Sequence, residues 1–320
     1  VVSDGELGKV GYSTYMIERL SGFGGHTDRK SAADLAEVPN LARKLSAIMG
    51  SQEFVRASCI DEVRLVTLEP LHDDIRRFKA ALANHAAPDT EAFMNAASPG
   101  LITAFQVNRF YPSHEAYLAA LVDAMREEYE TIVNAGFLLQ LDCPDLAMSR
   151  HTGYQDMTDA EFLKVAAANV EALNAATANI PPERMRMHVC WGNYEGPHDH
   201  DIPLEKVIDI VIGARAATVL FEAANPRHEH EWTVWRDARL PDWKVLAPGM
   251  IDTCSNYVEH PELIAQRIER FAAIVGPDRV VASTDCGFGT FAGYGKIDPL
   301  VTWKKLRALR EGADIAGARL

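Results

Sequence analysis

The sequence lacks several features that would assign it to a specialised class of protein. Its 320 residues contain no apolar stretch long enough to span a bilayer, and the first residues are neither basic nor followed by an apolar core. We therefore expect no membrane association and no secretory leader. Lys and Arg total 32 against 45 Asp and Glu, and the formal charge of -13 disfavours nucleic-acid binding, which depends on excess positive charge. Hydrophobic residues make up 48%, enough for a buried core, so the chain is not mainly disordered.

Cysteine is scarce, and its pattern argues against disulfide bonds. The five cysteines are odd in number and widely spaced, in a chain long enough to fold without covalent cross-links. They are Cys59, Cys143, Cys190, Cys254 and Cys286. We predict reduced thiols in a cytoplasmic protein, and reduced thiols are free to bind a metal.

Repeats, low-complexity tracts and Pro- or Ser-rich linkers are also missing, so we predict one domain over residues 1–320. From about residue 100 onward, short apolar runs alternate with longer amphipathic segments. The predicted strands are 137–142, 185–190, 218–222, 243–250 and 279–284, and the predicted helices are 113–136, 158–177, 204–217, 261–276 and 301–311. Buried strands that alternate with helices predict a parallel sheet. Because no Gly-x-Gly-x-x-Gly turn opens a dinucleotide-binding sheet, we predict a (β/α)8 TIM-type barrel.

Some element boundaries have sequence signatures. Ser113 and Gly136 are expected to begin and end one helix, residues 158–161 have the form of a capping box, and Gly312 is placed to end the last helix. Residues 63–68 alternate polar and apolar, which predicts an added hairpin or helical insertion in the N-terminal third, outside the barrel.

Polar residues gather at the carboxyl ends of the predicted strands, which converge on one face of a barrel. They are Asp142, His188, Cys190, Glu222, Asp285 and Cys286. His188 and Cys190 point to the same side because they are two residues apart on one strand. With Glu222 and Cys286 they offer one nitrogen, two sulfurs and one oxygen, a plausible tetrahedral zinc set. A buried histidine beside inert core cysteines is the alternative.

Together, these and other motifs resemble the cobalamin-independent methionine synthase superfamily, and within it the short single-barrel branch that includes epoxyalkane:coenzyme M transferases. The motifs that carry the resemblance span almost the whole chain in the family's order. They are Asp4-Gly5-Glu6, Gln140-Leu141-Asp142, His188-Val189-Cys190, the strand end at Glu222, Gly249-Met250-Ile251-Asp252 and Asp285-Cys286-Gly287. Family members have a further strand and helix before Asp-Gly-Glu, so we expect this first βα unit to be absent or to lie before Val1.

The resemblance implies Zn2+ as cofactor, with His188, Cys190, Glu222 and Cys286 as its ligands. Zinc lowers the pKa of a bound thiol, which is about 8.5 when free. Two cysteinate ligands cancel the charge of the ion and keep a substrate thiolate nucleophilic. We expect the hard carboxylate of Glu222 to yield its place to the substrate thiol. The implied reaction is transfer of a methyl or other alkyl group to a small thiol.

Carboxylates are expected to hold the substrates. In methionine synthases, the carboxylates that match Glu6 and Asp142 contact the amino group of homocysteine. Orientation of His188 or capping of a strand end is the alternative. Asp252 follows another strand and is expected to serve in either of these ways or in catalysis.

The segment after Cys190 is expected to form a wall of the thiol pocket through Trp191, Asn193 and Tyr194. For Trp191, packing between barrel and loop is an equal alternative. Further along the same segment, His198 and His200 suggest either a second metal site or a solvated loop.

The segment after Glu222 offers two alternatives as well. Arg227, His228 and His230 are either a receptor for an anionic substrate group or part of a solvated loop.

The sequence also departs from the methionine synthases. Their Asp-x-His-Ser stretch appears here as Asp252-Thr253-Cys254-Ser255, their Asp-Glu-Pro as Asp142-Cys143-Pro144-Asp145, and no tryptophan lies near residues 100–105 to stack a pterin. The resemblance therefore supports activation of a thiol by this chain better than it supports use of a methyl-folate donor.

The two versions of the reaction are methyl transfer from a folate-like donor to homocysteine and epoxide opening by coenzyme M. A metal-dependent hydrolase and a protein with structural zinc are the rivals from other classes, and a homo-oligomer is compatible with each.

Overall fold

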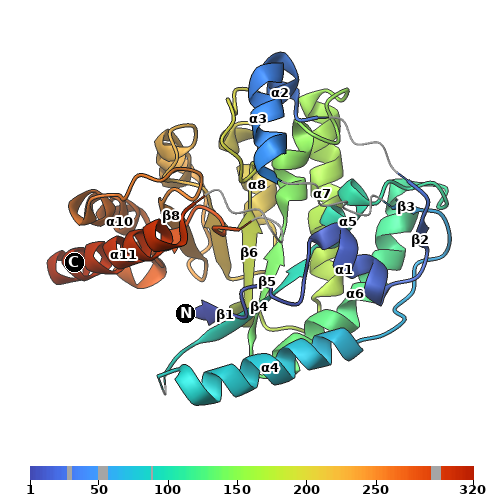
Figure 1. Ribbon diagram of the computed structural model, residues 1–320, viewed down its shortest axis with the longest axis horizontal. Coiled ribbons are helices and arrows are strands. Elements are labelled where there is room, and N and C mark those ends of the chain that lie inside the picture. Colours follow the sequence, from blue (N-terminus) through green and yellow to red (C-terminus); the bar gives the residue numbers. More distant parts are fainter. Residues whose placement is uncertain (27–30, 50–56, 88, 290–296) are drawn as a thin grey trace.

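The computed structural model describes residues 1–26, 31–49, 57–87, 89–289 and 297–320 (Figure 1). Within them, seven parallel strands form one curled sheet, and their order in the sheet follows the chain. The strands are β1 (Val2–Ser3), β4 (Ala92–Ala97), β5 (Leu138–Asp142), β6 (Met185–Val189), β7 (Thr218–Phe221), β8 (Val245–Ile251) and β9 (Ser283–Thr284). Alternation of strand and helix thus produces the predicted parallel α/β architecture.

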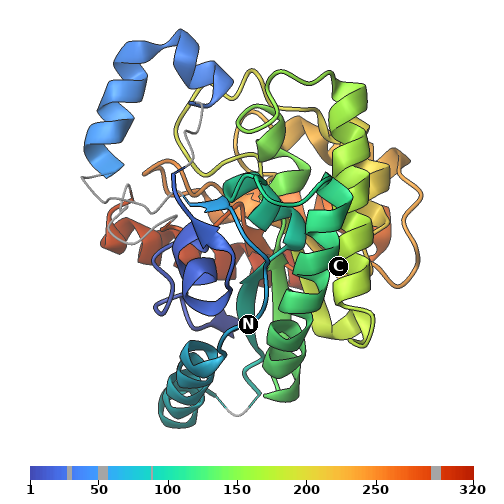
Figure 2. The ribbon, with the colours of Figure 1, turned by 90° about the vertical axis from the view of Figure 1, so that its right-hand side faces the viewer.

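Helices connect the strands and flank the curled sheet. They are α1 (Tyr12–Arg19), α2 (Ala33–Glu37), α3 (Pro39–Met49), α4 (Glu69–His85), α5 (Pro99–Phe105), α6 (His114–Asn134), α7 (Asp159–Ala176), α8 (Leu204–Ile212), α9 (Trp232–Asp237), α10 (Pro261–Val275) and α11 (Pro299–Arg319). Helices α6 and α7 pack side by side near one edge of the sheet, as do α10 and α11 near the other edge (Figures 1 and 2). None of the described helices is both long and apolar enough to cross a bilayer.

The two faces of the sheet differ in chemistry. Leu139, Leu141 and Met187 are fully buried and belong to the apolar core, whereas the residues between them along the strands are polar. Gln140 is paired with Arg186, and Asp142 with His188, across β5 and β6. Because successive side chains point to opposite faces of a strand, these four polar residues share one face. This polar face leads to the carboxyl ends of the strands.

Three predicted helix boundaries are confirmed. Ser113 caps α6 by accepting a hydrogen bond from the backbone N–H of Ala116, and Gly136 follows the helix with a φ of 101°. Thr158 and Glu161 form both hydrogen bonds of a capping box at the start of α7. These signals are local, so the sequence alone was sufficient to place them.

Two other predicted boundaries are wrong. Gly312 does not end the last helix, because α11 continues through it to Arg319. A Cβ atom at Gly312 would lie 2.5 Å from Cβ of Ile264, so this glycine lets α11 approach α10 closely. The helix predicted over 204–217 ends at Ile212, because buried Lys244 donates hydrogen bonds to the carbonyls of Ala214 and Ala216, 2.6 Å from each.

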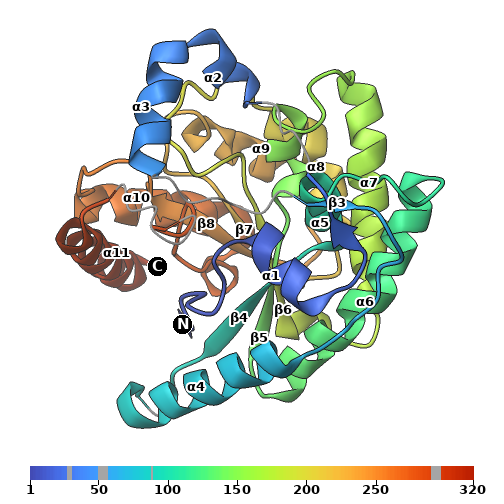
Figure 3. The same ribbon diagram turned by 45° about the vertical axis from the view of Figure 1, so that its right-hand side comes forward.

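The N-terminal third contains an insertion, but not the predicted hairpin over 63–68. Leu65 forms only an isolated bridge with Leu20, and Val66 is 65% exposed, so the alternating pattern is not paired in a sheet. An antiparallel pair is formed instead by β2 (Phe23–Gly24) and β3 (Ser58–Cys59), with α2 and α3 between them in the chain. Helices α2 and α3 lie at the top of the molecule and α4 lies at the bottom (Figures 1 and 3).

The two edges of the sheet also differ from expectation. Val2–Ser3 forms β1 beside β4, although the first βα unit was expected to be absent or to lie before Val1. The strand predicted over 279–284 is reduced to β9, since a 3-10 turn occupies Pro277–Arg279 and the β8–β9 register is irregular between Gly249 and Ile251. Among the described residues, β1 and β9 are not paired with each other. The structure therefore establishes a curled half-barrel, and closure into eight strands is not shown.

Candidate metal centre

Three soft donor groups converge at the carboxyl ends of the strands. His188 near the end of β6, Cys190 just after it and Cys286 after β9 place one nitrogen and two sulfurs within 4.8 Å of one another. Cys286 Sγ lies 3.2 Å from Cys190 Sγ and 3.6 Å from His188 Nε2. On a tetrahedral zinc ion with ordinary bond lengths, such atoms are roughly 3.5 to 3.8 Å apart. The 3.6 Å separation matches this spacing, and the two sulfurs would need to move apart by about half an ångström for the three groups to share one zinc ion.

The orientation of His188 is set by a carboxylate. Its Nδ1 lies 3.6 Å from Oδ1 of Asp142, and its Nε2 lies 3.2 Å from the backbone carbonyl of Asp285 and 3.6 Å from Cys286 Sγ. The two oxygens of Asp142 accept hydrogen bonds from the side-chain amides of Asn95 (2.9 Å) and Gln140 (3.1 Å). A carboxylate held in this way fixes the tautomer that presents Nε2 to a metal.

The two thiols need a cation in order to ionise. The contact with Cys190 and burial together raise the pKa of the Cys286 thiol well above its usual value. Cys190 Sγ accepts one hydrogen bond, 3.2 Å long, from the backbone N–H of Gly192. Two buried neighbouring thiols cannot both become thiolates without compensating charge, and a divalent ion would supply it.

Glu222, the fourth predicted ligand, lies beside this trio rather than within it. Its Oε1 accepts a hydrogen bond from the backbone N–H of Trp191, and its Oε2 accepts one from the side-chain amide of Asn225, both at 2.7 Å. The carboxylate is one of the groups that raise the pKa of the Cys190 thiol. Glu222 is therefore near the candidate metal position, with both oxygens already partnered.

Asp285 holds the loop that carries these partners. Its carboxylate accepts hydrogen bonds, 2.8 to 2.9 Å long, from the backbone N–H groups of Ala223, Ala224 and Asn225. It also lies against Gly249, where a Cβ atom would come within 1.9 Å of Oδ1. Asp285 thus ties the loop after β7 to the strand end that precedes Cys286.

A cavity of about 300 Å³ opens at the candidate metal position. Cys286 and Glu222 contribute to its lining, together with three of the residues predicted to hold substrate or act in catalysis: Asn193, Tyr194 and Asp252. Asn193 accepts hydrogen bonds from Thr253 and Cys254 and donates one to the carbonyl of Gly287. The structure therefore brings these three residues to one side of the trio.

The other predicted substrate contacts lie outside the described lining of this cavity. Trp191 is fully buried, and its indole N–H donates to the carbonyl of Ile202, so it packs behind the cavity wall.

Burial and the neighbouring Asp142 raise the pKa of Glu6 to about 7. Glu6 and Asp142 are near enough to interact electrostatically, on the opposite side of His188 from Cys286.

The remaining candidates separate into three groups. Arg227 lines the cavity beside Glu222 and is the only Lys or Arg among its described lining residues. His198 and His228 are buried and hydrogen-bonded to Asp201, so neither is a solvated loop residue. His230 is exposed, as is His200.

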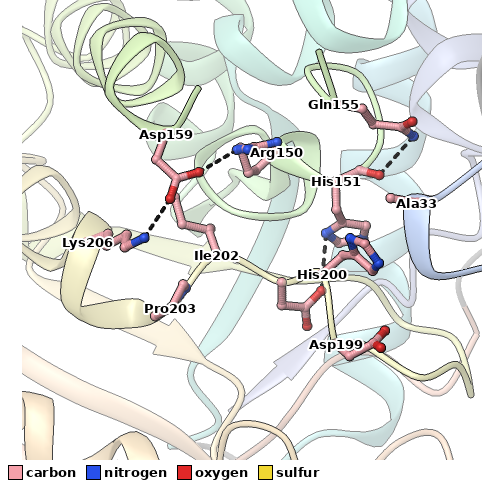
Figure 4. A pocket seen from close by; sticks show the side chains of 11 residues that line it. Ala33, Arg150, His151, Gln155, Asp159, Asp199, His200, Ile202, Pro203 and Lys206 are labelled. Atoms are coloured by element: carbon pink, nitrogen blue, oxygen red, sulfur yellow. Dashed lines mark hydrogen bonds and ion pairs between the residues drawn. The ribbon is translucent and has the colours of Figure 1, made fainter. Parts of the chain in front are cut away.

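A second, polar cavity of about 330 Å³ lies near His151 and His200 (Figure 4). Its two cationic side chains share one carboxylate: Arg150 Nε lies 2.8 Å and Lys206 Nζ 2.6 Å from the oxygens of Asp159. His200, with Glu37 and Asp199, forms an exposed group with metal-ligand chemistry. All three residues are solvent-accessible, and nothing else in the described structure marks them as a site.

Sequence reasoning missed several residues that shape the candidate metal centre. Asn225, which holds Glu222, has no signal in the sequence beyond its position three residues later. Asp34 in α2 accepts hydrogen bonds from the Tyr194 hydroxyl and the His198 N–H, across more than 150 residues of chain. Only the tertiary fold brings such partners together.

Comparisons with known proteins support the resemblance. A scan against protein-family models finds no match. The 2-hydroxypropyl-CoM lyase of Xanthobacter autotrophicus is 28% identical over 176 residues, which cover 47% of this chain and 45% of the lyase. The methionine synthase of Thermococcus kodakarensis is 22% identical over 99% of this chain and 78% of that enzyme. The chain therefore spans less than half of the first relative and about three quarters of the second.

A solved structure has a similar fold. The B12-independent methionine synthase from Shewanella sp. W3-18-1, in complex with selenomethionine, superimposes with a TM-score of 0.73 at 19% identity, covering 100% of this chain and 83% of that one. The curled parallel sheet therefore has the same fold as the corresponding part of this solved structure. The resemblance inferred from the sequence motifs is confirmed, because the relatives include both methionine synthases and a 2-hydroxypropyl-CoM lyase.

Proposed function

From the kinship of this chain with B12-independent methionine synthases and a coenzyme M lyase, we propose that it transfers a methyl or other alkyl group to the sulfur of a small thiol. The ligands of its zinc ion would be His188, Cys190 and Cys286, with Glu222 as a displaceable fourth. The observation that carries this proposal is the convergence of one imidazole and two thiols beside a cavity of about 300 Å³. A zinc ion bound there would supply the positive charge that favours ionisation of the substrate thiol.

The protein's own groups prepare this reaction. Asp142 holds His188 in the tautomer that presents Nε2, and the Gly192 N–H stabilises the Cys190 thiolate. Trp191 and Asn225 hold the Glu222 carboxylate, so that the substrate sulfur has room beside Cys286. In the reaction, the new S–C bond forms as the bond between carbon and the donor's leaving group breaks. Asp252, which lines the same cavity, would receive the thiol proton and pass it to solvent.

A second candidate is opening of an epoxide by a sulfonated thiol such as coenzyme M. The observation that favours it is Arg227, a cation in the described lining of a cavity that otherwise carries several carboxylates. An arginine pairs well with a sulfonate or carboxylate. The Glu6–Asp142 pair would instead suit the ammonium group of homocysteine, and it lies outside that lining.

Calorimetric titration of the zinc-loaded protein with homocysteine, coenzyme M and glutathione tests the function. We expect at least one of them to bind with release of a proton, because the thiol ionises on binding. Arg227→Ala should weaken the binding of a thiol with an acidic group about tenfold or more, the loss expected for one charge-assisted hydrogen bond. The binding of cysteamine, a thiol without an acidic group, should not change. Absence of binding by every thiol, together with turnover in thiol-free buffer, would indicate a hydrolase instead.

Glu222→Gln should retain most of the zinc, since the amide can still accept the hydrogen bond from Trp191 and the three soft donors remain. Zinc affinity, measured by competition with a chromophoric chelator, should fall less than in either cysteine variant. A larger loss of zinc than in Cys190→Ser would show that Glu222 is a principal ligand rather than a displaceable one.

We also propose that the half-barrel is part of a closed (β/α)8-type barrel and that residues 1–320 form one domain. Seven parallel strands in sequential order support closure, because that order is the one a barrel requires.

A further inference from the structure

A buried charged cluster adjoins the cavity, on loops that follow three neighbouring strands, and one of its members, His198, lines the cavity. Its centre is Asp201, whose side chain is only 3% exposed. Asp201 Oδ2 lies 2.9 Å from Nδ1 of His198 and 3.0 Å from Nε2 of His228, and Oδ1 lies 3.1 Å from Nδ1 of His151. These groups come from the segments after β5, β6 and β7, the strands that also carry the metal-centre residues.

The hydrogen bonds define the protonation of two of these rings. Nε2 of His198 faces the backbone carbonyl of Tyr194 at 2.9 Å, and Nδ1 of His228 faces Oε2 of Glu231 at 2.8 Å. Both nitrogens of each ring therefore face acceptors that have no hydrogen to give. A neutral imidazole has one N–H and an imidazolium has two, so only the charged form satisfies both contacts.

The surrounding charges agree with this geometry. For His228, burial opposes the charged form, but the hydrogen bonds to Asp201 and Glu231 outweigh it and raise its pKa to about 10. For His198, burial is likewise outweighed by Asp201 and the Tyr194 carbonyl, which raise its pKa. Glu222 raises the pKa of both rings through space.

The third ring differs. Burial lowers the pKa of His151, although Asp201 and Asp34 oppose this. Its Nε2 lies 3.4 Å from the hydroxyl oxygen of Tyr194, whose hydrogen is donated to Asp34. Its Nδ1 lies 3.1 Å from Asp201 Oδ1 but forms no hydrogen bond with it, so the burial of this ring is not offset as it is for the other two. His151 is thus a neutral neighbour of the same aspartate.

The two charged rings support residues beside the metal centre. The ring of Tyr194, which lines the cavity, stacks on His198 with centroids 4.2 Å apart. Trp191, which follows Cys190 and holds Glu222, packs against His228 in a tilted arrangement with centroids 4.4 Å apart. Cations under aromatic rings in a desolvated setting are stabilised there.

The cavity has an excess of negative charge. Its described lining includes the carboxylates of Glu195, Glu222, Asp252 and Asp285 against one arginine, Arg227, and the ring of His198. A substrate thiolate adds one more negative charge beside two cysteines. Buried cations nearby lower the free energy of such an anion, because the protein interior screens charge weakly.

We infer that His198 and His228 are positioning residues held as imidazolium cations by Asp201, and that their charge favours the thiolate form of the substrate in the adjoining cavity. The part that concerns the thiolate rests on the proposed function. The charge state of the rings does not, so the two are tested separately.

The first experiment is histidine titration by NMR on the full-length, zinc-loaded protein, with His198→Gln and His228→Gln used to assign the signals. We expect the His198 and His228 rings to remain protonated throughout the neutral range, with His228 losing its proton only near pH 10. Asp201→Asn should lower both pKa values. Rings that titrate at the ordinary value of about 6.5 would overturn the inference, whatever the protein does with thiols.

The second experiment measures the pH dependence of binding of coenzyme M and homocysteine by calorimetry. His228→Gln should raise the pH midpoint of thiol binding by about one unit, and so weaken binding about tenfold at neutral pH, while zinc content stays the same. His151→Gln is the matched control, since it removes a neutral ring from the same aspartate and should not move the midpoint. Equal shifts in both variants would mean that the cluster acts only as structural support, and would overturn the inference. If no thiol binds the unmodified protein, the proposed function fails, and the NMR result still decides the charge state.

Discussion

Cys286→Ser is expected to remove tightly bound zinc and to abolish transfer to thiols. Cys286 lies between the other two candidate ligands, because its sulfur contacts both Cys190 Sγ and His188 Nε2. Loss of a group that merely orients a ligand already costs about 10- to 100-fold in metal affinity or activity, so loss of a ligand should cost more than about 100-fold. Metal analysis after dialysis against a weak chelator, together with steady-state turnover, measures both effects.

The control for this prediction is Cys59→Ser. Cys59 lies in β3, outside the candidate metal centre, and its thiol is directed toward the carbonyl of Asp61. This variant should retain one zinc per chain even if its stability falls. Full zinc retention in both Cys286→Ser and Cys190→Ser would refute the ligand assignment.

The parts of the fold that the sequence could predict depend on local signals. A capping box at Thr158 or a glycine at position 136 acts within one helical turn, and buried strands show as short apolar runs. Gly312 shows the limit of such signals, since an identical residue serves as a helix end in one context and as a contact between α10 and α11 in another. The irregular edge at β9 depends on how β8 accommodates Asp285, which no short-range pattern records.

The candidate metal centre was predictable for a different reason. In a parallel sheet the carboxyl ends of all strands meet on one side, so strand ends alone brought His188, Cys190 and Cys286 together. The groups that set their chemistry were not predictable. Asn95 and Gln140 fix Asp142, and Asn225 holds Glu222, through contacts that depend on side-chain direction rather than on spacing.

These supporting contacts indicate how the chain keeps soft donors close together without a disulfide. Asp285 binds three successive backbone N–H groups of the loop after β7 and precedes Cys286 directly. The position of Cys286 is therefore coupled to the loop that orients Glu222. A rigid connection between Asp285 and the loop after β7 should therefore affect zinc binding more than the identity of any single residue that lines the cavity.

Gly249→Ala tests that coupling, and we expect it to cost both stability and zinc. The added Cβ would lie 1.9 Å from Oδ1 and 2.7 Å from the backbone N and Cα of Asp285, so the backbone of β9 has to move. Overpacking of this kind costs about 1 to 3 kcal/mol. The movement would also pull Asp285 away from the loop after β7 and Cys286 away from Cys190. Urea denaturation and zinc analysis on the same preparation measure the two effects.

Two other glycines of the chain separate these effects. In Gly312→Ala the new Cβ would lie 2.5 Å from Ile264 and 2.9 Å from the carbonyl of Pro261, so a comparable loss of stability is expected, but far from the metal centre and without loss of zinc. In Gly317→Ala the Cβ has no neighbour within 4 Å, and alanine at this helical position should be neutral or stabilise by up to about 1 kcal/mol. If Gly249→Ala lost no more zinc than Gly312→Ala at equal loss of stability, the junction at Asp285 would not control the metal centre. Zinc loss confined to Gly249→Ala would show that the close approach of β8 to Asp285 sets the position of Cys286.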